Sequence, residues 1–231
     1  MYKRQAEYYG GAMWLDYSDP ILTNVIISNN IAEHAGGGMR LSNSNPTLIN
    51  VTIANNTGGI YGGGGIYLNS SSPNIKNSIM WGNNPESIYI GSGLPNITYS
   101  NIDGGWVGES NIDADPLFVD PENGDYTLQE ASSCIDTGTA DIDGDGVDDI
   151  TDFIGSAPDM GALEFGESSD IIAGDTNFDG IVDILDIVRI VNNIMGNTEF
   201  NDDEFIAADF NADGIVDILD IVQIVNYILQ F

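Results

Sequence analysis

The sequence holds few cysteines, few basic residues and no long apolar run. Cys134 is the only cysteine, which excludes an intrachain disulfide and a cysteine-based zinc cluster. Lysine and arginine number 5 against 36 aspartates and glutamates, giving a formal net charge of -31. Such a chain repels nucleic acid phosphates and anionic membrane surfaces. We therefore expect no nucleic acid binding. Because no apolar run is long enough to span a bilayer, we also expect no membrane insertion.

The acidic residues are unevenly distributed along the chain. Only five of the 36 lie in the first 100 positions. Carboxylates crowded into the remainder repel one another unless cations neutralise them, so calcium is the first expectation. A solvated acidic surface is the alternative.

The N-terminal residues MYKRQ lack the apolar core of a signal peptide. Residues 1–5 resemble the translated end of a sequencing adapter, which favours a truncated gene whose true start and export signal are missing. On this interpretation, residues 6–110 are the C-terminal part of a longer repeat domain. The absence of a signal peptide then does not indicate the cytoplasm.

A repeat of about 26 residues fills the first half of the chain. Three segments align: GGAMWLDYSDPILTNVIISNN, GGGMRLSNSNPTLINVTIANN and GGGIYLNSSSPNIKNSIMWGNN. Short alternating runs bounded by Gly, Asn, Ser and Pro indicate strands and turns, and helical periodicity is absent. One unit cannot bury its apolar face, but stacked units can. The repeats resemble those of right-handed parallel β-helix proteins, which predicts a mostly β solenoid over residues 6–110.

Asparagines recur at two corners of each repeat. The first set is Asn24, Asn50 and Asn77, and the second is Asn30, Asn56 and Asn83. Asparagine tolerates a left-handed backbone and bonds the asparagine of the next coil, so we expect ladders at these corners.

Strand alternation predicts an outward-facing column. The leucine of each unit is expected to face inward: Leu15, Leu41 and Leu68. The residues that precede these leucines then face outward: Trp14, Arg40 and Tyr67. Such a column could bind a polysaccharide through ring faces and guanidinium hydrogen bonds. The alternative is that the three side chains stack on one another and shield the sheet.

The coils offer little for catalysis. Many β-helix proteins are polysaccharide lyases or glycoside hydrolases, which need a basic residue beside a calcium-bound uronate or a group of carboxylates. Beyond residue 5 the basic residues are Arg40, Lys76 and Arg189, and His34 lies in a turn with no obvious partner. The residues therefore favour a non-catalytic role. A targeted lyase or hydrolase and an adhesin or structural surface protein remain the alternatives.

Residues 111–166 depart from the repeat. The stretches DADPLF, DYTL, CIDTG and DMGALE resemble the choice-of-anchor Q region, which follows β-helices in secreted bacterial proteins and precedes a surface-attachment module. We expect this region to cap the solenoid and hide the open edge of its last coil. Residues 167–172 then form a linker.

The expected cap contains the acidic stretch DIDGDGVDDITD, residues 141–152. Its carboxylates have the spacing of a calcium loop, and a glycine at the sixth position permits the sharp turn. The predicted ligands are Asp141, Asp143, Asp145, Asp149, Asp152 and the backbone carbonyl of Val147. The alternative is a solvated acidic turn.

Residues 173–231 contain a near-duplication, GDTNFDGIVDILDIVRIVNNIMG and ADFNADGIVDILDIVQIVNYILQ. Each half begins with a twelve-position loop and runs into an apolar helix. The pair resembles the dockerin, an EF-hand-like module that binds cohesin domains in a calcium-dependent way. The resemblance implies two calcium ions. The ligands in the first loop are Asp175, Asn177, Asp179, Ile181, Asp183 and Asp186, and in the second Asp209, Asn211, Asp213, Ile215, Asp217 and Asp220, with Ile181 and Ile215 using their carbonyls.

The helices after these loops carry more apolar residues than one buried stripe needs. In dockerins, loop positions 10 and 11 select the cohesin and are often Ser-Thr; here they are Ile184, Leu185, Ile218 and Leu219. This departure predicts a more hydrophobic cohesin-like interface, or alternatively a self-packed surface tether. The resemblance implies a protein that is secreted or on the surface of a bacterium.

Overall fold

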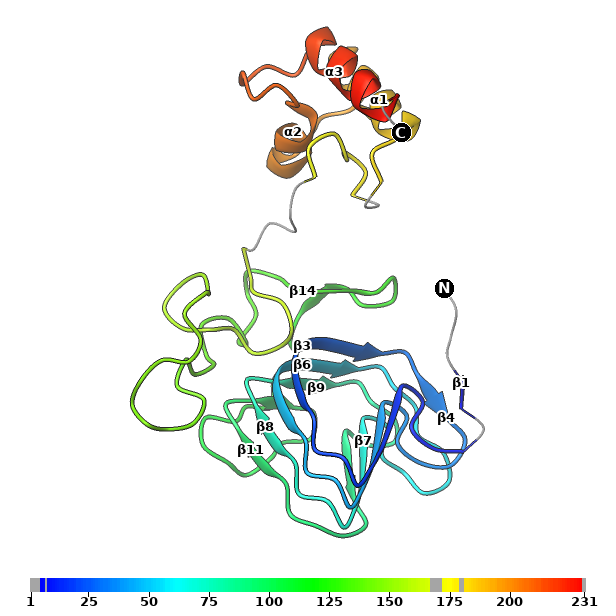
Figure 1. The fold of residues 1–231 in the computed structure, drawn as a ribbon, viewed down its shortest axis with the longest axis vertical. Helices are drawn as coiled ribbons and strands as arrows, with labels where there is room; N and C mark the ends of the chain where they lie inside the picture. Colours follow the sequence, from blue (N-terminus) through cyan, green and yellow to red (C-terminus); the bar gives the residue numbers. More distant parts are fainter. Residues whose placement is uncertain (1–4, 7, 167–171, 179–180, 230–231) are drawn as a thin grey trace. The chain divides into compact units, whose positions relative to one another are not determined.

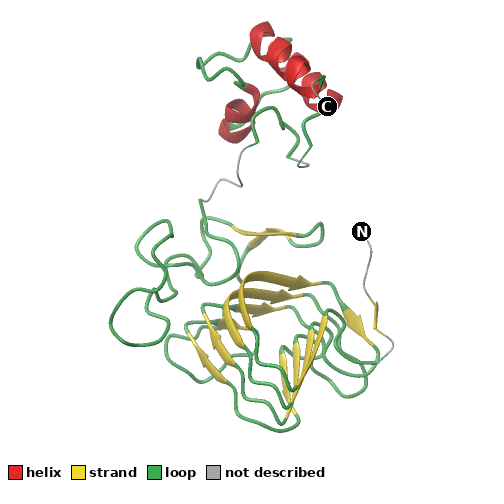
Figure 2. Ribbon diagram, viewed as in Figure 1, coloured by secondary structure: helices red, strands yellow, loops and turns green. Residues whose placement is uncertain are grey.

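The computed structural model describes residues 5–6, 8–166, 172–178 and 181–229. The chain forms two compact units, residues 1–167 and residues 168–231. Among the described elements, strands lie in the first unit and helices in the second (Figure 2). None of the described helices combines the length and apolarity needed to cross a membrane.

The first unit is built from short strands. They are β1 (Gln5–Ala6), β2 (Met13–Asp16), β3 (Ile21–Ser28), β4 (Ile31–Ala32), β5 (Met39–Ser42), β6 (Thr47–Ala54), β7 (Ile66–Asn69), β8 (Asn74–Lys76), β9 (Ile79–Trp81), β10 (Ile88–Ile90), β11 (Asn96–Thr98), β12 (Asn101–Ile102), β13 (Phe118–Asp120) and β14 (Asp125–Leu128).

Strands of successive coils pair in parallel and form a solenoid, residues 8–114 (Figure 1). One sheet has the order β10-β7-β5-β2, and another has the order β11-β8-β6-β9-β12 with β3 beside β6. The inward-facing residues of the middle coils are 0% exposed: Met39, Leu41, Ile66 and Leu68. The alternation expected from the repeat is therefore present, with the leucines of these coils inside.

The two asparagine corners differ in what the asparagine contributes, which is a left-handed backbone at one corner and side-chain hydrogen bonds at the other. Asn24, Asn50 and Asn77 have φ of 54°, 51° and 48°, the left-handed backbone expected there. At the other corner the amides form the ladder: the Asn30 side chain donates to Asn56 at 2.9 Å, and that of Asn56 donates to Asn83 at 3.1 Å. The left-handed backbone of this second corner lies one position earlier, at residues 29, 55 and 82.

A short segment covers the last coil. Ile112 accepts a backbone hydrogen bond from Ile102 at 3.0 Å, and the Asn111 side chain donates to Ile97 at 2.8 Å. Trp106 packs against the main core cluster. Residues 106–112 therefore lie against the last coil.

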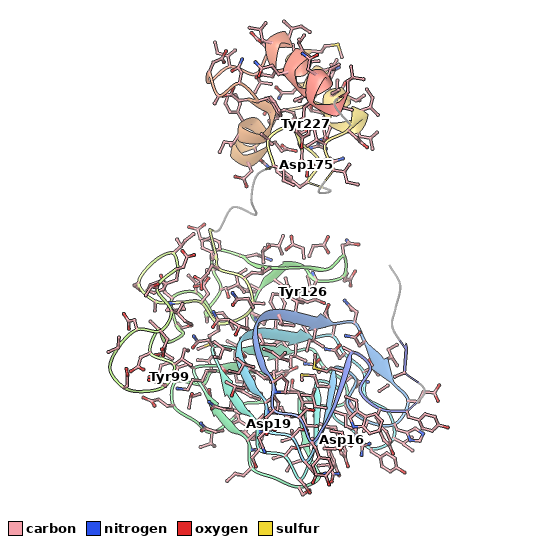
Figure 3. All side chains as sticks on the ribbon, viewed as in Figure 1. Asp16, Asp19, Tyr99, Tyr126, Asp175 and Tyr227 are labelled. Carbon is pink, nitrogen blue, oxygen red and sulfur yellow. The ribbon has the colours of Figure 1, made fainter. Side chains whose placement is uncertain are left out.

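The rest of the expected cap, the lateral segment (residues 115–165), contacts the side of the solenoid. The Tyr126 hydroxyl accepts from Asn29 and Asn55, which belong to successive coils (Figure 3). Met160, Leu128 and Cys134 form a second core cluster with Ile79 of β9. The role of residues 111–166 as a cap that hides the open edge of the last coil stays a prediction. The outer face of β9 is apolar and requires cover along the solenoid. The likeness to a choice-of-anchor Q region stays a prediction.

The second unit contains α1 (Ile184–Ile194), α2 (Asp202–Ala208) and α3 (Ile218–Ile228). Its core cluster contains the buried residues Ile190, Ala208 and Ile224, one from each helix, and Ala207 of α2 is buried as well. Surrounding apolar side chains are only partly buried. A core this small leaves the unit dependent on other stabilising interactions.

Candidate metal and docking sites

The loop of residues 209–220 is folded around its own carboxylates. The Gly214 N–H donates to Asp209 Oδ2 at 2.8 Å, and the Asp213 N–H donates to Asn211 Oδ1 at 2.8 Å. The Ile215 N–H donates to Asp213 Oδ1 at 2.9 Å. The side chains at loop positions 1, 3 and 5 are therefore held on the inside of one turn, as a hard cation requires.

The twelfth residue closes each loop from a buried position. Asp220 and Asp186 are both 0% exposed. Asp220 accepts the N–H of Asn211 at 3.1 Å and of Asp217 at 2.9 Å. Asp186 likewise accepts from loop positions 2, 3 and 9, namely Thr176, Asn177 and Asp183. Each closing carboxylate thus ties the start of its loop to the first turn of a helix.

The same aspartates begin the helices. Asp183 is the N-cap of α1 and Asp217 the N-cap of α3, each in a capping box with the closing aspartate of its loop. Asp175 opens the first loop (Figure 3) and is 2% exposed. Of the predicted ligands, Asp179 lies outside the described residues, as does the loop glycine Gly180.

The charge of the second unit fits a divalent cation. Residues 168–231 contain 13 acidic residues and one basic residue, Arg189. Arg189 forms an ion pair with Glu204 of α2. The donor set of carboxylate and amide oxygens suits calcium better than a soft metal.

Apolar side chains beside the loops are exposed in matched pairs. Ile184 and Ile218 are both 63% exposed, and Leu185 and Leu219 are 57% and 55% exposed. Val188 and Val222 are both 50% exposed. We call these six residues the docking faces; α1 supplies one face and α3 the other (Figure 1). Within the second unit each of the six is at least half exposed.

The acidic loop of the lateral segment, residues 141–152, has hydrogen bonds like those in the first half of the loop of residues 209–220. The Gly146 N–H donates to Asp141 Oδ2 at 2.9 Å, and the Asp145 N–H donates to Asp143 Oδ1 at 3.1 Å. Hydrogen bonds from Gly146 and Gly144 hold the pKa of Asp141 below its ordinary value. Asp141, Asp143 and Asp149 each place one carboxylate oxygen within 4.8 Å of the others.

This loop closes at its ninth residue. Asp149 Oδ2 accepts the N–H of Ile142 at 2.8 Å and of Asp143 at 3.2 Å, which correspond to loop positions 2 and 3. The twelfth residue makes these contacts in the loop that Asp186 closes. Asp152 is not part of the carboxylate group around Asp141. The spacing of the acidic residues did not predict that Asp149 takes this place. No helix follows this loop to position the twelfth residue near the start of the loop.

The side chains of the outward column contact neighbouring aromatic rings. Trp14, Arg40 and Tyr67 are in register on β2, β5 and β7. The Arg40 guanidinium lies 3.5 Å from the Tyr9 ring centroid, and Tyr67 stacks on Tyr89 with centroids 5.1 Å apart. Trp14 is 55% exposed, and a polysaccharide contact here stays a prediction, as does the mutual-stacking alternative.

Two members of the column were missed from the sequence. Tyr89 could have been found by aligning Ile88–Ile90 with the IYL of the preceding coil. Tyr9 lies before the first aligned unit. His34 packs edge-on against three rings, those of Tyr8, Tyr9 and Tyr61.

Comparison with known protein families agrees with the two-unit organisation. Residues 8–108 match the right handed beta helix region, and residues 173–229 match the dockerin type I domain. Neither curated proteins nor solved structures provide a match. Dockerin domains typically bind calcium and dock onto cohesin domains in extracellular assemblies.

Proposed function

From a chain that joins a right-handed β-helix region to a dockerin type I domain, we propose a calcium-dependent attachment protein. Residues 173–229 dock a cohesin domain through the docking faces, and calcium orders the two loops that support these faces. The β-helix is the part that becomes attached. A secreted or cell-surface location in a bacterium follows from this role.

The observation that carries the proposal is the matched exposure of the docking faces. Large apolar side chains exposed together mark a surface that another protein covers. Four of the six occupy positions 10 and 11 of the calcium loops, directly before the closing aspartates, so ordering of the loops fixes their positions. Isoleucine and leucine at the selecting positions support a cohesin surface that is more hydrophobic than one that accepts Ser-Thr.

We propose that each loop of the dockerin unit binds one calcium ion. The ligands are those derived from the sequence, with Asp186 and Asp220 as the buried closing carboxylates. The excess of acidic residues in residues 168–231, 13 against one basic residue, supports this assignment. A cation would offset the repulsion within each loop.

Surface plasmon resonance against a panel of recombinant type I cohesin domains tests the docking proposal. We expect binding in calcium and none in chelator. Because the two faces are equivalent, Ile184→Ser with Leu185→Ser should leave residual binding, and so should Ile218→Ser with Leu219→Ser. The quadruple variant should lose binding.

The matched control for this experiment is Ile206→Ser on α2, which changes an exposed apolar side chain (55% exposed) outside the docking faces. It should bind as the unmodified chain does. Full binding by the quadruple variant, or binding that persists in chelator, would refute docking through these faces.

We also propose a third calcium ion in the lateral segment, held by Asp141, Asp143 and Asp149, with Asp145 as a further ligand. Native mass spectrometry should then count three ions on the chain. Asp149→Asn should leave two ions, whereas Asp152→Asn should leave three. Loss of an ion from Asp152→Asn would instead favour the twelve-position ligand set and the Val147 carbonyl. A count of two on the unmodified chain would refute the third site.

The role of the attached β-helix has three candidates. The first is a surface that recognises polysaccharide, the second is a dockerin-targeted lyase or glycoside hydrolase, and the third is an adhesin or structural surface protein. Of these, we propose that the β-helix recognises polysaccharide or serves as a structural spacer, and that it does not catalyse a reaction. The solenoid offers only Arg40 and Lys76 as basic residues after residue 5, and Lys76 donates to the Ile142 carbonyl.

A further inference from the structure

A cavity of about 330 Å³ lies where the lateral segment meets the first asparagine corner of the solenoid. Its floor is formed by Thr23, Asn24 and Asn50, and its walls are residues 149–152 and 161–164. Both sides belong to the first compact unit. The cavity is separate from the aromatic column and from the docking faces.

Asn50 is the unusual residue of this cavity. It is 8% exposed, and its Oδ1 is buried without a hydrogen-bond partner. Asn77, the equivalent residue of the next coil, uses both ends of its amide: it donates to the Thr139 carbonyl at 2.8 Å and accepts the Thr139 N–H at 2.9 Å. A buried unpaired amide oxygen is destabilising, and such groups in folded proteins need an explanation.

The charge of the lining favours a ligand without negative charge. Asp149, Asp152 and Glu164 line the cavity, and no lysine or arginine does. Thr23, Asn24 and Thr151 add hydroxyl and amide groups that both donate and accept. The site therefore offers many acceptors, several donors and a negative potential.

The spacing of the carboxylates argues against a single metal ion in this cavity. Of the acidic residues that line the cavity, Asp149 belongs to the group Asp141, Asp143 and Asp149, whose carboxylate oxygens lie within 4.8 Å of one another. Asp152 and Glu164 are not in it. Acceptors spread over a cavity of this size suit a molecule with several separate donors, and the volume is at the lower end of the range for small-molecule sites.

We propose that this cavity binds a saccharide unit that carries no negative charge, with Asn50 and Asp152 accepting hydrogen bonds from its hydroxyl or amine groups. The proposal is independent of cohesin docking by residues 173–229. It also differs from the predicted polysaccharide contact at Trp14, Arg40 and Tyr67.

Saturation-transfer NMR and calorimetry on the full chain in calcium provide the test. The probes are cellotetraose, xylotetraose and mannotetraose as neutral saccharides, a glucosamine tetramer as an amine-bearing one, and a galacturonate tetramer as an anionic comparison. We expect at least one neutral or amine-bearing probe to bind and the galacturonate tetramer not to bind.

Asn50→Gly is the discriminating variant, since glycine accepts the φ of 51° at this position. It should weaken binding about tenfold. Its melting temperature should not fall, because the lost oxygen has no protein partner. Asn43→Gly is the matched control: it has φ of 49° in the same coil, does not line the cavity and should bind normally.

Asp152→Asn is a second variant with an exposed side chain, and it should also weaken binding. Failure of every neutral and amine-bearing probe to bind would overturn the proposal. Binding that is unchanged in both Asn50→Gly and Asp152→Asn would overturn it too, as would a preference for the galacturonate tetramer. Loss of cohesin docking would leave these outcomes unaffected, so the two proposals fail separately.

Discussion

At the scale of single residues, buried polar groups decide where the chain is rigid and where it can bind. Asn56 is 0% exposed, and its side-chain amide is hydrogen-bonded at both ends. The oxygen accepts from Asn30, and the nitrogen donates to Ile27 and Asn83. Asn50, at the other corner of the same coil, has an unpaired oxygen. The same residue type therefore supports the coil at one corner and lines a cavity at the other.

Asn56→Ala should destabilise the first unit by about 2–4 kcal/mol, because it leaves several buried backbone and amide groups without partners. Chemical denaturation followed by tryptophan fluorescence measures this. Asn69→Ala, on a partly exposed strand position, should change stability by less than about 0.5 kcal/mol. Equal effects of the two substitutions would contradict a structural role for the ladder.

Cys134 provides a second test at this scale. Burial raises the pKa of its thiol, and the side chain is 0% exposed in the core beneath the lateral segment. A raised pKa means less thiolate at pH 8, so both charge and access slow its reaction. Ellman's reagent should label the native chain very slowly and the denatured chain at once. Rapid labelling of the native chain would show that the lateral segment does not pack as described.

At the scale of elements, the acidic loops and their helices form single structural units. A closing aspartate is at once a predicted ligand, a partner in a capping box and a tie to the start of its loop. In the lateral segment no helix follows, and the loop closes three residues earlier. Similar ligand spacing therefore leads to two different structures, depending on the element that comes next.

Helix α2 allows capping to be tested without touching a predicted ligand. Asn201 accepts the Glu204 N–H at 2.8 Å, and Glu204 accepts the Asn201 N–H at 2.9 Å. Asn201→Ala should lower the stability of the second unit by about 1 kcal/mol. Thermal melts by circular dichroism in calcium measure it, with Asp203→Asn, an exposed charge change on the same helix, as control. A melt unchanged from that of the control would argue against the cap.

At the scale of the whole molecule, the two units differ in the size of their apolar core relative to their number of acidic residues. The first has a continuous apolar core along the solenoid, whereas the described part of the second has four buried apolar residues beside the unit's 13 acidic residues. Their stabilities should therefore depend differently on calcium.

Chelation of calcium should remove most of the helical circular dichroism of the chain, since every described helix lies in the second unit. All three tryptophans, Trp14, Trp81 and Trp106, lie in the first unit, so their fluorescence serves as an internal control. We expect it to change little. Helical signal that survives in chelator would show that the dockerin unit folds without metal.

The sequence by itself determined the repeat, its register, the inward leucines and the left-handed corner at Asn24, Asn50 and Asn77. It also determined the two dockerin loops, because their ligand spacing and following helices are local in the chain. These features depend on backbone geometry over a few residues or on one coil stacking on its neighbour.

Only the tertiary structure decided where the lateral segment lies, which residue closes the acidic loop at Asp141 and which rings complete the column at Arg40. It also created the cavity at Asn50. Each of these depends on contacts between residues far apart in the chain, such as Thr52 with Ala162 or Asn77 with Thr139. No local spacing encodes such contacts, because they arise from the shapes of two surfaces that meet only after both have folded.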